Sequence, residues 1–114
     1  MKIAQMLFEM GISFLHHVEF EFRSLGNGGK HAIWCPDFVF GQPLRWTGEK
    51  CNGSVIIGLE VKRSHVKGKP LSRSRSLLAD KGIPILLVDR DTVVRYFQEG
   101  KKLPLKPVRM TNAA

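Results

Sequence analysis

Three charged residues lie where the sequence otherwise predicts buried strands. Glu60 and Lys62 end an apolar, β-branched run that begins at Val55. Since alternate side chains of a strand project to the same face, this carboxylate and this ammonium lie side by side. Burying two such charges is costly unless each has a partner. We therefore predict a divalent metal ion as the missing partner, held also by Asp37 in the earlier segment Cys35–Phe40.

The Glu60 and Lys62 pair has a simpler interpretation, as an ion pair at a strand end that emerges into solvent. The dipeptide Pro36–Asp37 on the preceding predicted strand separates the two interpretations. It adds a second carboxylate on a neighbouring strand, and carboxylate oxygens are ligands that Mg²⁺ prefers. The metal-site interpretation is therefore favoured over the solvated ion pair.

Apolar periodicity predicts the elements that must position these residues. Apolar residues spaced i, i+3, i+4 and i+7 predict a helix over 2–10, and apolar–polar alternation predicts a strand over 14–23. Pro36 lies within the next predicted strand, 31–40, and implies a sheet edge or a bulge there. Later patterns predict a long connection over 41–53, a strand over 54–63, a helix over 70–81, a strand over 85–88 and a helix over 91–99 capped by Asp91.

The strand–helix–strand succession over 54–88 predicts two parallel strands joined by a right-handed crossover. The fold class is therefore α/β, with a central mixed β-sheet flanked by helices. At 114 residues the chain has room for one hydrophobic core. We expect a single domain over 1–100, followed by a basic, Pro-containing and flexible tail over 101–114.

The charge balance restricts the class of partner. The chain has 18 Lys and Arg residues against 10 Asp and Glu, for a net charge of +8 at pH 7. This is typical of proteins that bind nucleic acid or an anionic membrane surface. A membrane partner is disfavoured because the basic residues are not combined with a large apolar face. No run approaches the ~20 apolar residues that span a bilayer. No signal-peptide cleavage site follows the first residues, so a cytoplasmic or nucleoid-associated protein is expected.

The order of these features resembles the PD-(D/E)XK nuclease superfamily: a helix, a strand, a strand with Pro36–Asp37, a strand with Glu60–Val61–Lys62, a helix and a strand. The resemblance covers about residues 1–90. In size and element order the chain is similar to the archaeal Holliday junction resolvases within that superfamily. The resemblance implies a restriction-endonuclease-like core for the α/β domain. The gap between Asp37 and Glu60 is longer than the short hairpin common in the family, so residues 41–53 are expected to form an insertion or an extended hairpin.

The resemblance also implies a role for each residue of the motif. Asp37 and Glu60 hold Mg²⁺, for which Mn²⁺ is able to substitute, and the backbone carbonyl of Val61 adds a third oxygen ligand. Lys62 orients and acidifies the attacking water. The superfamily usually has a further Glu on the first helix, where Glu9 is the one carboxylate and lies later than expected. Glu9 is therefore a candidate catalytic residue, with a solvated helix residue as the alternative. No small-molecule cofactor is implied.

The densest basic stretch directly follows Lys62 and is expected to contact DNA. Phosphate contacts of this kind position a substrate but read no sequence, and the start of the helix near Pro70 offers further N–H groups to phosphate. Trp46, beside Arg45, is a candidate for stacking on bases and equally for a packing or dimer contact. The candidate DNA-contacting residues are Arg63, His65, Lys67, Lys69, Arg73 and Arg75, with Arg45 and Trp46.

Together these features predict a Mg²⁺-dependent DNA endonuclease that hydrolyses phosphodiester bonds. The chain is too small to carry a separate sequence-reading domain, so a structure-directed, junction resolvase-like enzyme is expected, as a homodimer that cuts two strands. A sequence-specific, mismatch-repair or homing endonuclease of the same superfamily is one alternative. A catalytically inactive nucleic-acid-binding module on a nuclease fold is the alternative from a different functional class.

Overall fold

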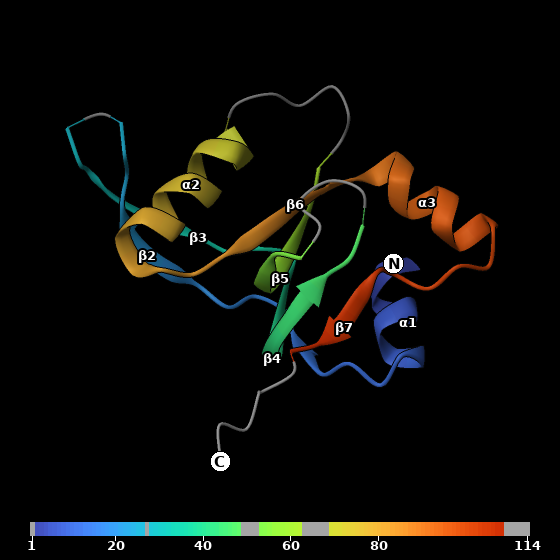
Figure 1. Ribbon diagram of the computed structural model, residues 1–114. Coiled ribbons are helices and arrows are strands. Elements are labelled where there is room, and N and C mark those ends of the chain that lie inside the picture. The colour runs from blue at the N-terminus through green and yellow to red at the C-terminus, as the bar shows by residue number, and fades with distance from the viewer. Residues whose placement is uncertain (1, 27, 49–52, 63–68, 109–114) are drawn as a thin grey trace, which may run out of the picture.

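The computed structural model describes residues 2–26, 28–48, 53–62 and 69–108 (Figure 1). These residues form an α/β fold with a mixed β-sheet, as the sequence predicts. The elements in chain order are α1 (Lys2–Glu9), β1 (Phe14–Leu15), β2 (Phe20–Arg23), β3 (His31–Trp34), β4 (Phe38–Trp46), β5 (Val55–Lys62), α2 (Lys69–Lys81), β6 (Ile85–Asp89), α3 (Arg90–Gln98) and β7 (Leu105–Pro107).

The main sheet of the described residues has five strands, in the order β1-β4-β5-β6, with β7 also paired to β4. Strands β5 and β6 are parallel and are separated in the chain by α2, which confirms the predicted strand–helix–strand unit. The β1–β4, β4–β5 and β4–β7 pairs are antiparallel, so the sheet is mixed. The register sets Phe38 opposite Leu59 and Lys62 opposite Asp89. The ends of β5 and β6 therefore meet at one end of the sheet, where β4 begins.

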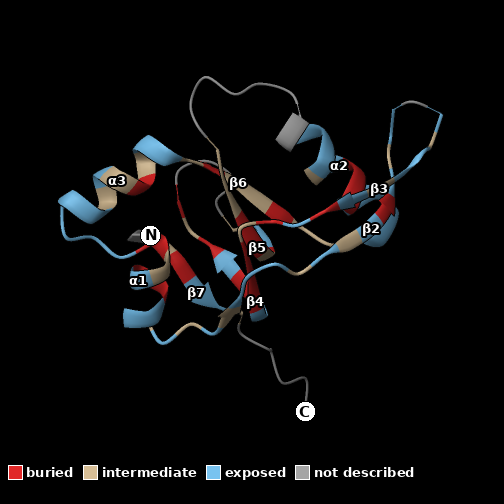
Figure 2. Cartoon of the chain, turned by 180° about the vertical axis from the view of Figure 1, so that it is seen from behind, coloured by how far each residue is buried: buried red, intermediate tan, exposed pale blue. Residues whose placement is uncertain are grey.

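Different elements cover the two faces of this sheet, as Figure 1 shows. Helices α1 and α3 cover one face, and α2 covers the other together with a separate two-stranded ribbon, the β2–β3 hairpin. Buried residues concentrate on the central strands, whereas exposed residues lie toward the outer ends of the hairpin and the helices (Figure 2). The core on the first face includes Ile3, Leu7, Phe38, Leu59, Val88 and Val93, and the core on the second includes Phe22, Trp34, Leu77 and Ile85.

Two of the predicted strands are each divided between two sheets. The strand predicted over 14–23 is interrupted, because β1 pairs with β4 and β2 pairs with β3. His17, in the interruption, has a left-handed backbone with φ of 60°. The strand predicted over 31–40 is likewise broken around Pro36, which has no N–H to donate to a ladder. Alternation continues through both breaks, so the pattern alone conceals them.

Strand β4 extends through much of the segment predicted as a long connection over 41–53. It continues to Trp46 with a register shift against β5 between Val39 and Leu44. Gly41 and Pro43 resemble loop residues in the sequence, but an irregular stretch of strand accommodates both. Strands β4 and β5 are antiparallel neighbours, so the extended hairpin, one of the two alternatives for 41–53, is confirmed.

The chain beyond residue 100 contributes to the core. We expected the domain to end near residue 100, whereas Leu105–Pro107 forms β7 against the edge of β4. Leu103 and Leu105 are buried, at 2% and 7% exposed. Two leucines that alternate around Pro104 give this basic segment one apolar face, which net composition does not reveal.

The helices predicted over 2–10, 70–81 and 91–99 are confirmed as α1, α2 and α3. The N-cap of α3 is Asp89, two residues before the predicted cap Asp91, which lies in the first turn. Both positions favour an acidic residue because of the helix dipole, so the sequence pattern does not separate them. Among the described residues, no helix combines the length and the apolar character needed to cross a membrane.

Candidate active site

Asp37 and Glu60, which the sequence places far apart, are joined at the start of β4 and the end of β5. The backbone N–H of Asp37 donates to Oε1 of Glu60 at 2.9 Å. In return, the N–H of Val61 donates to Oδ2 of Asp37 at 2.8 Å. Each carboxylate is therefore anchored by the backbone of the other's strand. The structure brings together the two acidic residues that the sequence motif selected.

The electrostatic environment of Glu60 is unusual for a surface carboxylate. Burial, and after it the nearby charge of Asp37, raise the pKa of Glu60 from 4.5 to about 7. The Asp37 N–H and a side-chain hydrogen bond from the Trp34 indole act in the opposite direction and favour the ionised form. A second negative charge at this position is therefore disfavoured until a cation arrives.

The backbone of Val61 contacts the same pair of carboxylates. Its N–H donates to Oδ2 of Asp37 at 2.8 Å, so the residue after Glu60 lies directly beside the second carboxylate. A backbone carbonyl is a hard oxygen ligand of the kind that Mg²⁺ prefers, and the Val61 carbonyl stays the predicted third ligand.

Lys62 lies on the same face of β5 as Glu60, two residues further along the strand. Its Nζ lies 3.7 Å from Oδ1 of Asp89, the residue opposite it on β6. The side chains of Lys62 and Asp89 are 35% and 39% exposed. The ammonium is therefore paired with a carboxylate of the neighbouring strand.

Glu9 lies elsewhere. It is exposed on α1, where Nε2 of Gln5 donates to its Oε1 at 3.1 Å. It also lines a cavity of about 220 Å³ that includes Phe97 and Lys102 near the end of α3. Glu9 is not among the groups that shift the pKa of Glu60. The geometry therefore agrees with the alternative of a solvated helix residue, and it leaves Asp37 and Glu60 as a two-carboxylate pair.

The described residues contain no group of three or more His, Cys, Asp and Glu side chains arranged to hold a metal ion. A cation at the Asp37–Glu60 pair would therefore complete its shell with backbone carbonyl, water or substrate oxygens. Mg²⁺ is commonly bound in this way, by one or two carboxylates with several waters and phosphate oxygens.

The basic candidates are distributed over three segments. Arg73 and Arg75 are exposed on α2, which packs on the second core. The side chain of Leu59 belongs to the first core, so alternation along β5 directs Glu60 to the face that α2 covers. Arg45 is exposed on β4, where its Nη1 donates to the carbonyl of Gly53. Lys69 is the first residue of α2. The predicted contacts Arg63, His65 and Lys67 lie outside the described residues.

Trp46 belongs to the core. Only 5% of its surface is exposed, and it packs in the cluster that contains Leu44 and Leu105. Stacking on a base needs an open ring face. Of the two roles left open by the sequence, the structure therefore supports packing for Trp46.

Three further residues lie near the pair, and the sequence predicted none of them as a site residue, giving Asp89 a capping or turn role. Trp34 contributes its indole N–H to Glu60, and Asp89 contacts Lys62. His16 is the third, since its Nδ1 lies 3.0 Å from the carbonyl oxygen of Asp37. Only Asp89 has a sequence signal, because it ends a strand predicted to run parallel to the strand of Lys62. The other two contacts depend on how the hairpin and β1 fold back onto β4.

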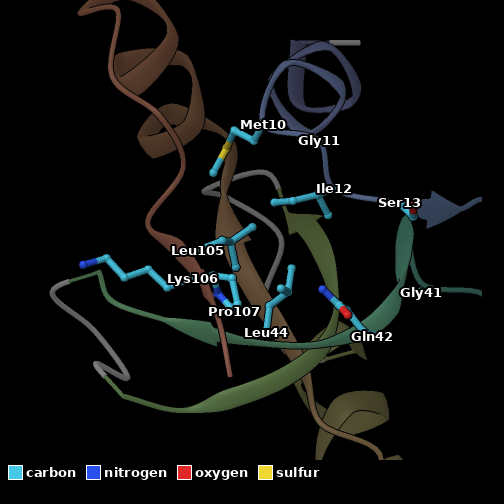
Figure 3. A pocket seen from close by; sticks show the side chains of 10 residues that line it. All are labelled: Met10, Gly11, Ile12, Ser13, Gly41, Gln42, Leu44, Leu105, Lys106 and Pro107. Atoms are coloured by element: carbon cyan, nitrogen blue, oxygen red, sulfur yellow. The ribbon is translucent and has the colours of Figure 1, made fainter. Parts of the chain in front are cut away.

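A separate cavity of the described surface lies away from these residues. Figure 3 shows a cavity of about 350 Å³ between the end of α1, the middle of β4 and β7. Its polar side chains are Ser13, Gln42 and Lys106, and no carboxylate lines it. It does not share a residue with the Asp37–Glu60 pair.

Comparisons of this chain with protein-family models, with curated proteins and with solved structures give no match. Its function is therefore inferred from its own residues and their geometry.

Proposed function

We propose that this protein is a Mg²⁺-dependent DNA endonuclease with a restriction-endonuclease-like core, and that it acts on branched DNA as a homodimer. The observation that carries the proposal is the interlocked pair of Asp37 and Glu60 on adjacent strands, with Lys62 on the same strand face as Glu60. A half-buried carboxylate with a pKa near 7, beside a second carboxylate, is typical of a functional site.

The topology supports the proposed core. Helix α1, strands β1, β4 and β5, helix α2 and strand β6 follow the order that the family resemblance implies. The motif residues fall at the start of β4 and at the end of β5, on neighbouring antiparallel strands. The β2–β3 hairpin is an addition between β1 and β4.

The donor set fits Mg²⁺, because two carboxylates and a carbonyl are all hard oxygen ligands. Asp37, Glu60 and the Val61 carbonyl would hold the ion. When bound, the ion supplies Lewis-acid stabilisation of the phosphoryl oxygens and a bound water of lowered pKa. Its positive charge also replaces the repulsion between the two carboxylates by attraction, which lowers the pKa of Glu60.

The remaining chemistry belongs to Lys62. An ammonium donates hydrogen bonds and accepts none, so it orients a water by that water's oxygen. A positive charge beside the water favours loss of its proton, and it also stabilises the negative charge that develops on the phosphoryl group. Lys62 is reachable for this purpose because its side chain is 35% exposed.

DNA as the substrate is supported by charge. The net charge of +8 attracts a phosphate backbone, and Arg73 and Arg75 lie exposed on α2, the helix that covers the face to which alternation directs Glu60. Phosphate contacts without base contacts recognise the shape of a nucleic acid and not its sequence. This favours a structure-directed enzyme in a chain with a single domain.

Cleavage of a labelled four-way junction and of its matching linear duplex tests the proposal. Wild type is compared with Glu60→Gln and Lys62→Ala, in Mg²⁺ and in EDTA. Lys101→Ala is the matched control, since Lys101 is an exposed lysine beside Glu99, far along the chain from the pair. We expect cuts in the junction that need Mg²⁺, and a loss of rate of about 100-fold or more in Lys62→Ala.

The outcomes separate the rival functions. Equal cutting of both substrates would support a nuclease but contradict junction specificity. The alternative of a sequence-specific, mismatch-repair or homing endonuclease would then be favoured. Salt-sensitive binding without cutting of any substrate, in Mg²⁺ or Mn²⁺, would overturn the enzyme and leave a nucleic-acid-binding module.

A further inference from the structure

Asp89 is the residue that contacts the proposed catalytic lysine. It ends β6 and lies directly opposite Lys62 in the parallel β5–β6 ladder. Its Oδ1 is 3.7 Å from Nζ of Lys62. Asp89 is not among the groups that shift the pKa of Glu60, so its contact within the site is with the lysine.

The conformation of Asp89 shows that its carboxylate does not serve the helix that follows. Asp89 is the N-cap of α3, with φ of −69° and ψ of 136°, yet its side chain makes no capping hydrogen bond. Asp at an N-cap normally accepts a hydrogen bond from the N–H of the second or third helical residue. Here the carboxylate lies beside Lys62 instead.

Stability alone is a weak reason for this arrangement. The two side chains are 35% and 39% exposed, and ion pairs as exposed as this one contribute little to folding because water screens them. A lysine side chain, in contrast, has a flexible four-carbon stem and many rotamers. A partner at its tip restricts the ammonium to one region, which matters for a group that must orient a water.

We propose that Asp89 is a positioning residue that holds the Lys62 ammonium on the face of β5 that carries Glu60. This inference rests on the proposed nuclease function. In this role Asp89 acts through Lys62 and not on the substrate itself. Its contribution therefore appears in the rate of the bound complex and not in the affinity for DNA, because misplacement of a catalytic group slows the chemical step.

The test measures kcat and KM for junction cleavage in Asp89→Asn, Lys62→Ala and the double variant. Asn caps a helix as well as Asp does, so Asp89→Asn removes the charge and preserves the start of α3. Asp91→Asn is the control, since it removes an exposed carboxylate two residues later in the first turn of the same helix. Thermal unfolding of each variant verifies that the fold is retained.

We expect Asp89→Asn to lower kcat by about tenfold with KM within about twofold of wild type. In the Lys62→Ala background the same change should have no further effect, and Asp89→Glu, which keeps the carboxylate, should recover most of the rate. Wild-type kcat in Asp89→Asn, or an equal loss in the presence and absence of Lys62, would overturn the role. Absence of cleavage by wild type would instead overturn the nuclease function itself.

Discussion

Asp37 and Glu60 are held by an exchange between strands: the Asp37 N–H donates to the Glu60 carboxylate, and the Asp37 carboxylate accepts from the N–H of Val61, the residue after Glu60. Both side chains are thus positioned by backbone groups that cannot rotate away. Two acids held this close repel each other when both are ionised. That repulsion contributes to the raised pKa of Glu60, which can be measured.

Glu60 should make the metal-free protein less stable at alkaline pH. The pKa of Glu60 in the folded chain is about 7 against 4.5 ordinarily, so the folded state holds this proton more tightly than the unfolded state. The associated stability is fully present below pH 4.5 and is lost as the pH rises through about 7. Because the group is only half buried, we expect a loss of about 2 kcal/mol after allowance for solvent screening.

Urea unfolding in EDTA at pH 5 and at pH 8.5 measures this loss. Glu60→Gln keeps the shape of the side chain and an acceptor for the Asp37 N–H, so it should flatten the pH dependence and be more stable than wild type at pH 8.5. Glu19→Gln, at an exposed position, should follow wild type. Parallel stability curves for wild type and Glu60→Gln would contradict the raised pKa.

Binding of Mg²⁺ should release a proton, because the ion binds the ionised pair and Glu60 is protonated below a pKa of about 7. We expect close to one proton per site at pH 6 and almost none at pH 8.5. Calorimetric titration in two buffers of different ionisation enthalpy counts the protons. Release that does not change with pH, or that persists in Glu60→Gln, would assign the proton to another group.

Trp34 should tune the same equilibrium. Its indole hydrogen bond favours the ionised form of Glu60, so Trp34→Phe should raise the pKa of Glu60 above about 7. The pH at which Mg²⁺ binding is half-maximal should move upward by about one unit. Phe20→Leu alters the packing of the same hairpin without removing a polar group, and it should leave this midpoint in place. A shift of equal size in both variants would show that the effect comes from packing.

The C-terminal strand should be part of the cooperative fold. Leu105 is 7% exposed and lies in the main core, so Leu105→Ala should lower the free energy of unfolding by about 2–4 kcal/mol. The neighbouring Lys106 is exposed on the same strand, and Lys106→Ala should change stability by less than about 0.5 kcal/mol. Chemical unfolding compares the two directly. Equal, small effects would mean that β7 frays without consequence for the domain.

The elements that the sequence predicted best are those set by local pattern. Helices α1 and α2 and strands β5 and β6 follow from apolar periodicity bounded by Gly and Pro, and the strand–helix–strand unit follows from their order. Asp37 and Glu60 could be predicted as site residues because each is a carboxylate beside or within an apolar strand segment. That signal does not depend on which strands pair.

The features that escaped prediction depend on pairing between distant segments. Alternation over 14–23 is the same whether its two halves join one sheet or two, and only the partners β4 and β3 decide this. Leu103 and Leu105 resemble residues of a tail in the sequence, and only the pairing of β7 with β4 shows that this segment belongs to the fold. Trp34 acquires its role at Glu60 from the path of the hairpin, which no single segment encodes.

The β2–β3 hairpin therefore cannot be removed without affecting the acidic pair. Two residues alone separate Trp34 from Asp37, so the last strand of the hairpin runs almost directly into the acidic pair. Replacing the hairpin by a short turn would remove Trp34 and its hydrogen bond, and would therefore raise the pKa of Glu60. A redesigned hairpin should keep the Trp34 indole, or another hydrogen-bond donor in its place, so that the pKa of Glu60 does not change together with any change in substrate choice.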